Sequence, residues 1–134
     1  MTAANFTSLV ETTCIDVLSK VQEVLIKEHS VRSRIRSKIT RSGGMISRMI
    51  LSLTEPTQHW RQGEIAQSYI LEEVNFWGGK KIVTIMVSWN EFPHSTEKAL
   101  VIIEVEEAFK EVVNRIIVSN LDRLETLGTV MRDG

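Results

Sequence analysis

Apolar residues recur at helical spacing near the start of the chain. Five of them are separated alternately by four and three positions: Val10, Cys14, Val17, Val21 and Val24. This spacing places them on one face of an α-helix. Ser8 and Glu11 fit a capping box, in which the two side chains satisfy free amides of the first turn. The pattern therefore predicts an amphipathic helix from Ser8 to about Glu28.

The pattern changes to strict alternation between Val31 and Ile39, where a cation stands at every second position. A period of two predicts a β-strand with its four cations on one face. The helical stripe could instead continue through Val31 and Ile35, and the helix would then stop at Gly43-Gly44. Both interpretations fit the local sequence.

A hairpin gives the strand interpretation an independent check. If Ser42-Gly43-Gly44 is a three-residue loop, Ile35 pairs with Leu51 and Lys38 with Arg48. One face of the hairpin is then largely apolar and the other basic, whereas a two-residue loop would mix the two. The strand is therefore the preferred interpretation.

A second hairpin is predicted from strands Glu64–Phe76 and Lys80–Asn90, with Gly78-Gly79 as its turn. In this register Val74 faces Val83. One face is then apolar and contains Phe76, Val74, Ile70, Val83, Ile85, Val87 and Trp89. The opposite face is mixed and contains Tyr69, Leu71, Glu73, Ile82, Thr84 and Met86. A half-apolar second face predicts partial cover by a helix or by another subunit.

The last third of the chain carries two apolar stripes at helical spacing. The first is Ile102, Val105, Phe109, Val112 and Ile116, and the second is Val113, Ile117, Leu121 and Leu124. They predict a long helix that Ser95 or Thr96 caps and that Gly128 ends. The β-branched run Leu100–Val105 leaves an alternative open, namely a strand followed by a helix that begins near Glu106.

Together these elements predict one α+β domain over residues 1–134. It consists of an N-terminal helix, an antiparallel three- to five-stranded sheet built from hairpins, and a long C-terminal helix packed on the sheet. The composition, 43% hydrophobic and 25% charged, is that of an ordinary globular protein.

The bulk properties also restrict the compartment. A single cysteine, Cys14, excludes an internal disulfide and a cysteine-rich zinc site. The longest apolar run, Ala99–Ile103, is far too short to span a bilayer. We therefore expect a soluble cytoplasmic protein, or an intracellular or virion-associated one if the source is viral, without a membrane partner.

The charge is unevenly distributed although the net charge is only −1. Residues 27–48 contain seven basic side chains and one acidic one. Such a patch indicates an anionic partner, and nucleic acid is the candidate. The candidate anion-binding residues are Arg32, Arg34, Arg36, Lys38, Arg41, Arg48 and Arg61. The alternative is a solvated face, or one that pairs with Glu104, Glu107 and Glu111.

Catalytic chemistry is not indicated. His29, His59 and His94 lack metal-ligand spacing. Cys14 lies on an apolar stripe without a basic neighbour, as expected of a buried side chain and not of a nucleophile. We therefore expect no enzyme, no catalytic or metal-binding residues and no cofactor.

Two stripes on one helix and a mixed second sheet face amount to a surplus of apolar surface. We therefore expect a non-enzymatic protein that works by assembly, such as a chaperone-like, adaptor or viral connector-type subunit, with itself or another protein as partner. The candidate interface residues are Trp60, Trp77, Ile116, Ile117, Leu121 and Leu124. The alternative is a nucleic-acid-binding module that uses the basic face of residues 32–48.

Overall fold

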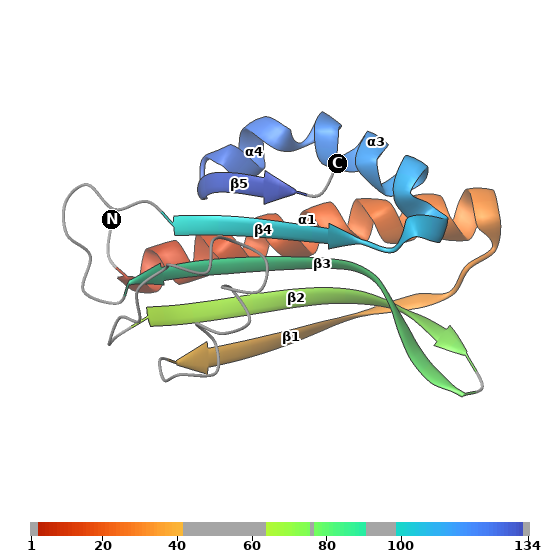
Figure 1. The fold of residues 1–134 in the computed structure, drawn as a ribbon, viewed down its shortest axis with the longest axis horizontal. Coiled ribbons are helices and arrows are strands. Elements are labelled where there is room, and N and C mark those ends of the chain that lie inside the picture. Colours follow the sequence, from red (N-terminus) through yellow and green to blue (C-terminus); the bar gives the residue numbers. More distant parts are fainter. Residues whose placement is uncertain (1–2, 42–63, 76, 91–98, 133–134) are drawn as a thin grey trace.

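A computed structural model describes residues 3–41, 64–75, 77–90 and 99–132 of the chain. The elements follow in the order α1 (Ala3–His29), β1 (Ser33–Arg41), β2 (Glu64–Asn75), β3 (Gly78–Asn90), β4 (Ala99–Val105), the 3-10 turn η1 (Glu107–Phe109), α3 (Lys110–Ser119), α4 (Leu121–Glu125) and β5 (Gly128–Arg132). Figure 1 shows the strands side by side with α1 running along them. The predicted α+β class is therefore confirmed.

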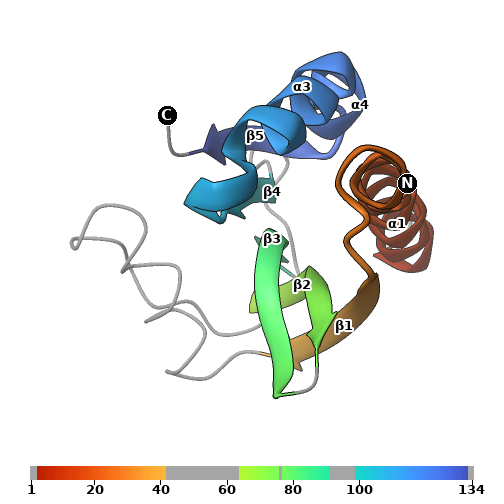
Figure 2. The same ribbon diagram turned by 90° about the vertical axis from the view of Figure 1, so that its right-hand side faces the viewer.

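The five strands form one mixed sheet in the order β1-β2-β3-β4-β5. Neighbouring strands are antiparallel from β1 to β4, but β5 runs parallel to β4. The expected wholly antiparallel sheet is therefore wrong. Figure 2 shows α1 and the α3–α4 pair on the same side of the sheet. We call the face toward these helices the inner face and the opposite one the outer face.

The core lies between the inner face and the helices. Four residues of the predicted α1 stripe are fully buried there, namely Val10, Cys14, Val17 and Val21, and Leu25 replaces Val24 as the next buried position. They pack with inner-face residues such as Leu71 and Ile85. The capping prediction is wrong, because α1 already begins at Ala3 and Ser8 lies inside it.

The helix ends before the alternating segment, so the strand interpretation of residues 33–41 is correct and the continued helix is wrong. Ser30 takes a left-handed conformation with φ of 55°. Its amide donates to the Ile26 carbonyl, and the Val31 amide donates to the Leu25 carbonyl. These bonds close the last turn of α1, after which the chain enters β1. The predicted partner strand around residues 45–53 lies outside the described residues.

The turn and register between β2 and β3 differ from the prediction. Gly78 and Gly79 belong to β3, and Leu71 pairs with Val83 next to an irregularity at Leu71/Glu72. From Glu64 to Leu71 the predicted register is therefore shifted by an odd number of residues, and beyond the irregularity it is shifted by an even number. An odd shift moves side chains to the other face. As a result Ile70 lies on the outer face, while Tyr69 joins the core.

The predicted long C-terminal helix is also wrong, and the alternative with a strand is correct. Leu100 and Val105 lie in β4, and the helices that follow are short. Gly128 does not merely end a helix but begins β5 beside Ala99. A Cβ atom at Gly128 would lie only 2.0 Å from the Ala99 carbonyl oxygen, so this close strand contact requires glycine.

Candidate anion-binding face

Alternation along β1 sends its cations to the outer face. Ile35 packs against the core on the inner side, so its neighbours Arg34 and Arg36 point outward. Lys38 follows on the same side, and Arg32 continues the register because its carbonyl accepts a hydrogen bond from the Val74 amide. We call Arg32, Arg34, Arg36 and Lys38 the cationic row. All four side chains are exposed.

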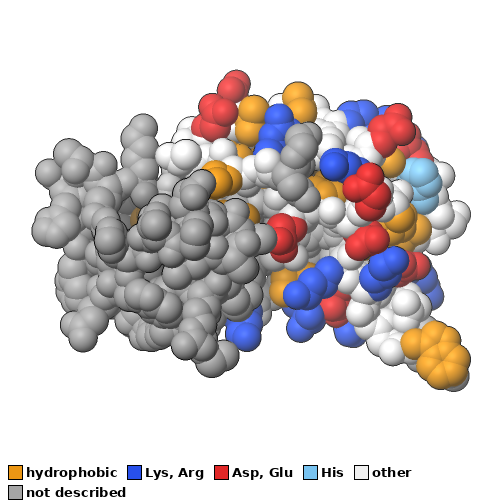
Figure 3. Space-filling model, viewed as in Figure 1, with side chains coloured by type: hydrophobic (Ala, Val, Ile, Leu, Met, Phe, Trp, Pro, Cys, Tyr) orange, Lys and Arg blue, Asp and Glu red, His pale blue; other side chains and the backbone are white. Residues whose placement is uncertain are grey.

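The cationic row is regularly spaced. Alternate residues of a strand lie about 6.6–6.8 Å apart along its axis. The row runs along β1, which forms one edge of the sheet among the described strands. Lys81 of β3 adds a further exposed cation, because its Cα pairs with Glu72 across the β2–β3 register. Figure 3 shows Lys and Arg side chains gathered on the lower part of this view, where Figure 1 places β1 and β2.

One carboxylate organises the middle of the row. Glu72 of β2 pairs directly with Arg34 and is only 4% exposed. Its Oε1 accepts a hydrogen bond from Arg34 Nε and forms an ion pair with Arg36 Nε at 3.0 Å. The bonds use Nε and leave the outer N–H groups of each guanidinium for other acceptors. Glu72 therefore holds two arginines in place without neutralising both.

The neighbouring strand leaves room for this carboxylate. A Cβ atom built on Gly79 would lie 2.6 Å from both Cδ and Oε2 of Glu72. The Glu72 carboxyl group therefore occupies space that a side chain at Gly79 would fill. The hydrogen bond from Arg34, followed by the charges of Arg34 and Arg36, lowers the pKa of Glu72 below its ordinary value. The carboxylate consequently stays ionised at neutral pH.

Arg32 and Lys38 form no ion pair with any residue that the structure describes. Within the row and Lys81, five cations therefore face one carboxylate. Glu104, Glu107 and Glu111, the acidic residues of the alternative interpretation, form no ion pair with the row among the described contacts. Glu107 instead pairs with Lys110, at 3.7 Å. The side chains of Arg41, Arg48 and Arg61 lie outside the described residues.

An aromatic residue lies near one end of the row. Trp77 occupies the turn between β2 and β3 and is 90% exposed. Its amide donates a hydrogen bond to Asn75 Oδ1 at 3.0 Å. Val74, which precedes the turn and lies opposite Arg32, is also exposed. Trp60, the other candidate tryptophan, lies outside the described residues.

The C-terminal interface candidates are placed differently. Ile117 and Leu124 are fully buried in the core of the single chain, so neither side chain is part of its surface. Ile116 packs against that core, and Leu121 is half-buried. The surplus of apolar surface also shrinks on the sheet, because outer-face residues such as Met86 and Ile102 are buried within the single chain.

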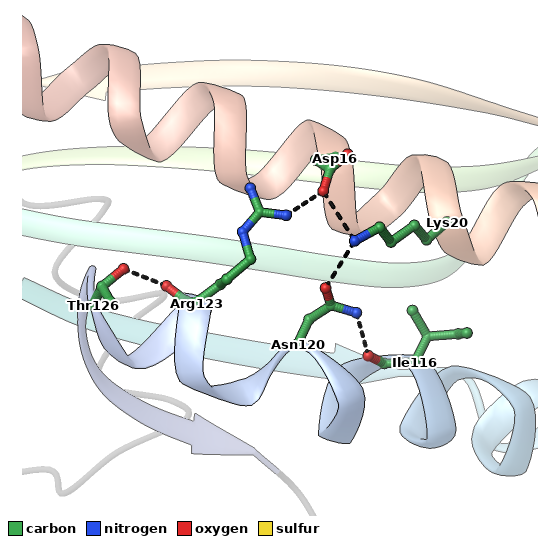
Figure 4. Close-up of polar contacts among 6 residues, drawn as sticks. All are labelled: Asp16, Lys20, Ile116, Asn120, Arg123 and Thr126. Carbon is green, nitrogen blue, oxygen red and sulfur yellow. Dashed lines mark hydrogen bonds and ion pairs between the residues drawn. The ribbon is translucent and has the colours of Figure 1, made fainter.

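The helical side of the molecule is held by a polar network (Figure 4). Asp16 of α1 pairs with Arg123 and with Lys20, the latter at 3.3 Å. Lys20 also donates to Asn120 Oδ1 at 3.1 Å, and Asn120 Nδ2 donates to the Ile116 carbonyl at 2.8 Å. These contacts tie α1 to α3 and α4, so this surface of the C-terminal helices is already occupied.

The described residues were also compared with what a metal site, a reactive thiol and a membrane-spanning helix each require. No group of three His, Cys, Asp or Glu side chains there could hold a metal ion. Burial raises the pKa of the Cys14 thiol to about 12, which makes it a poor nucleophile. Within the same residues, no helix combines the length and apolarity needed to cross a bilayer.

Two residues beside the row were not among the sequence-predicted site residues. Glu72 and Lys81 stand at positions that only the correct β2–β3 register brings together. A carboxylate directly across from Arg34 could have been recognised only after β1 had been paired with β2. Comparisons of the chain with protein-family models, curated proteins and solved structures found no match.

Proposed function

We propose that this protein acts by binding and not by catalysis, and that the cationic row holds a nucleic acid. One observation carries the proposal: four cations stand on one exposed strand face, and their only described counter-charge is Glu72. Lys and Arg side chains on such a surface neutralise phosphates and release counterions. The regular spacing of the row suits a partner with repeated negative charges.

The test is binding of fluorescently labelled oligonucleotides, measured by anisotropy at low and at physiological salt. The informative variant is R32E/K38E, because neither residue pairs with a described side chain and folding should survive. We expect at least tenfold weaker binding and a salt slope that is smaller by about two. The matched control is K27E/R132E, which makes the same charge change at exposed positions of α1 and β5, outside the row.

The control separates a site from general charge. Equal weakening in R32E/K38E and K27E/R132E would mean that only net charge matters, and the row would lose its role. No binding by the unmodified protein at low salt would remove nucleic acid as the partner. Circular dichroism of each variant shows that the fold is retained.

A second candidate function is assembly with copies of itself or with another protein, as an adaptor, chaperone-like or connector subunit. The observation that favours it is the exposure of Trp77 and Val74 together beside one turn. Exposed tryptophans are frequent anchors of protein interfaces. Sedimentation or light scattering at micromolar concentration tests self-association. The homo-oligomer would be refuted if the unmodified protein is a monomer and Trp77→Ala has the same molecular mass in solution.

A further inference from the structure

We infer that the nucleic acid is single-stranded, with its phosphates along the cationic row and a base stacked on Trp77. This inference rests on the proposed function and names the class of its ligand. It joins two features that the fold brings together. Arg32 begins the row opposite Val74, and Trp77 lies only three residues beyond Val74. The Arg32 end of the row therefore lies toward the same end of the sheet as the β2–β3 turn that carries Trp77.

The shape of the β2–β3 end supports this arrangement. In Figure 1 these two strands extend beyond β4 and curl away from the helices. Trp77 at their turn is the most exposed of the large hydrophobic residues that the structure describes. A ring in this position can lie against a flat partner without moving any part of the core.

The exposed ring beside the row, and not the spacing of the row, favours one strand over two. A strand's alternate cations stand about 6.6–6.8 Å apart, which resembles the separation of neighbouring phosphates along an extended nucleic-acid strand. Bases of a single strand are free to stack on an exposed aromatic ring. Bases of a duplex are already stacked inside it, so Trp77 could contact only its edge or backbone.

Glu72 adds order to the phosphate contacts. Its carboxylate binds the Nε atoms of Arg34 and Arg36, so the two guanidinium groups are fixed before any ligand arrives. Fixed donors lose less conformational freedom on binding than free ones. Glu72 thus acts as a positioning residue, while the outer N–H groups of the two arginines contact phosphate.

The experiment compares three oligonucleotides of equal length: a mixed-sequence single strand, the same strand in a duplex, and a strand with abasic sites. The variants are Trp77→Ala and Trp77→Phe, with Val118→Ala as the control at another exposed apolar position. We expect the single strand to bind more tightly than the other two. Trp77→Ala should weaken its binding about 5- to 150-fold, to the level of the abasic strand.

The remaining outcomes are equally decisive. Trp77→Phe should restore part of the lost affinity, and Val118→Ala should change nothing. Equal affinity for single strand and duplex, with no effect of Trp77→Ala, would overturn the single-strand inference while the proposed function survives. Absence of binding to all three oligonucleotides would instead remove the proposed function itself. Loss of self-association in Trp77→Ala, without loss of oligonucleotide binding, would assign the ring to a protein contact.

Discussion

Neighbouring residues of β2 bury side chains of different chemistry on the two faces of the sheet. On the inner face, Leu71 and Ile85 are buried among aliphatic side chains of α1 and its neighbours. On the outer face, one residue further along β2, Glu72 is almost as deeply buried but is held by two arginines. The contrast shows that burial alone does not mark a hydrophobic core, because a paired carboxylate can also be shielded from water.

The largest expected effect breaks the inner face. Ile85→Ala removes a fully buried side chain and should cost about 2–5 kcal/mol of unfolding free energy, because a cavity remains among rigid neighbours. Thr84→Ala, one position away on the outer face, is the matched control and should cost less than about 1 kcal/mol. Urea denaturation measures both. Equal losses would mean that the two faces do not differ in packing.

A smaller effect concerns the close contact between strands β4 and β5. Gly128→Ala places a methyl group against the Ala99 carbonyl, and backbone atoms cannot move aside as a flexible side chain can. We expect a loss of about 1–3 kcal/mol. Amide hydrogen exchange should show faster opening at β4 and β5 than at β1 and β2. Thr129→Ala, which is exposed, serves as the control, and an unchanged Gly128→Ala would contradict the tight strand contact.

The contribution of the outer-face residue Glu72 to stability should depend on pH. The pKa of Glu72 is lowered from its ordinary value of 4.5 in the folded protein. Its ionised form therefore stabilises the fold above that value, and the contribution disappears as pH falls through the lower, folded pKa. The stability difference between the unmodified protein and Glu72→Gln should be full at about pH 7 and shrink below about pH 4.5.

Asp16 offers the matched comparison on the helical side. Its hydrogen bonds to Arg123 and then Lys20 also lower its pKa, but its side chain is far more exposed than that of Glu72. Asp16→Asn should therefore show the same sign with a smaller amplitude, which added salt reduces further. A larger and less salt-sensitive effect at Asp16 would reverse the comparison.

The smallest expected effect concerns Ile39, an exposed residue on the inner side of β1. Ile39 stands on the inner side of β1 like Ile35, but it is 61% exposed whereas Ile35 packs against the core. Ile39→Ala should change stability by no more than about 0.5 kcal/mol, and Ile35→Ala by roughly 0.5–3 kcal/mol. Thermal unfolding followed by circular dichroism measures both. A large loss at Ile39 would show that cover by α1 is not what matters.

Local periodicity was sufficient for the buried face of α1, and it favoured β1 without excluding a continued helix. The 4-3 spacing around Val10 and Cys14 and the alternation from Val31 to Ile39 each report one buried face. Strands β2 and β3 are harder, because both their faces are apolar at positions such as Ile70 and Leu71. Nothing local then penalises a shifted register. Gly78-Gly79 added to the error, since glycines that suit a turn are used inside β3.

The candidate site was predictable only in part. The cations were visible from their spacing, but Glu72 required a long-range pairing that no local pattern reports. The parallel strand β5 was equally hidden, because a glycine at residue 128 is as typical of a helix end as of a close strand contact. Ile117 and Leu124 looked surplus only while the C-terminal segment was treated as one long helix.

The link between Asp16 and Arg123 joins positions 107 residues apart. During synthesis, α1 therefore leaves the ribosome long before the helices that lie against it exist. Until then its apolar stripe can find only the strands made in the interval. A ribosome-stalled chain that ends before residue 110 should accordingly be a substrate for chaperones, because it lacks α3 and α4, which pack against α1.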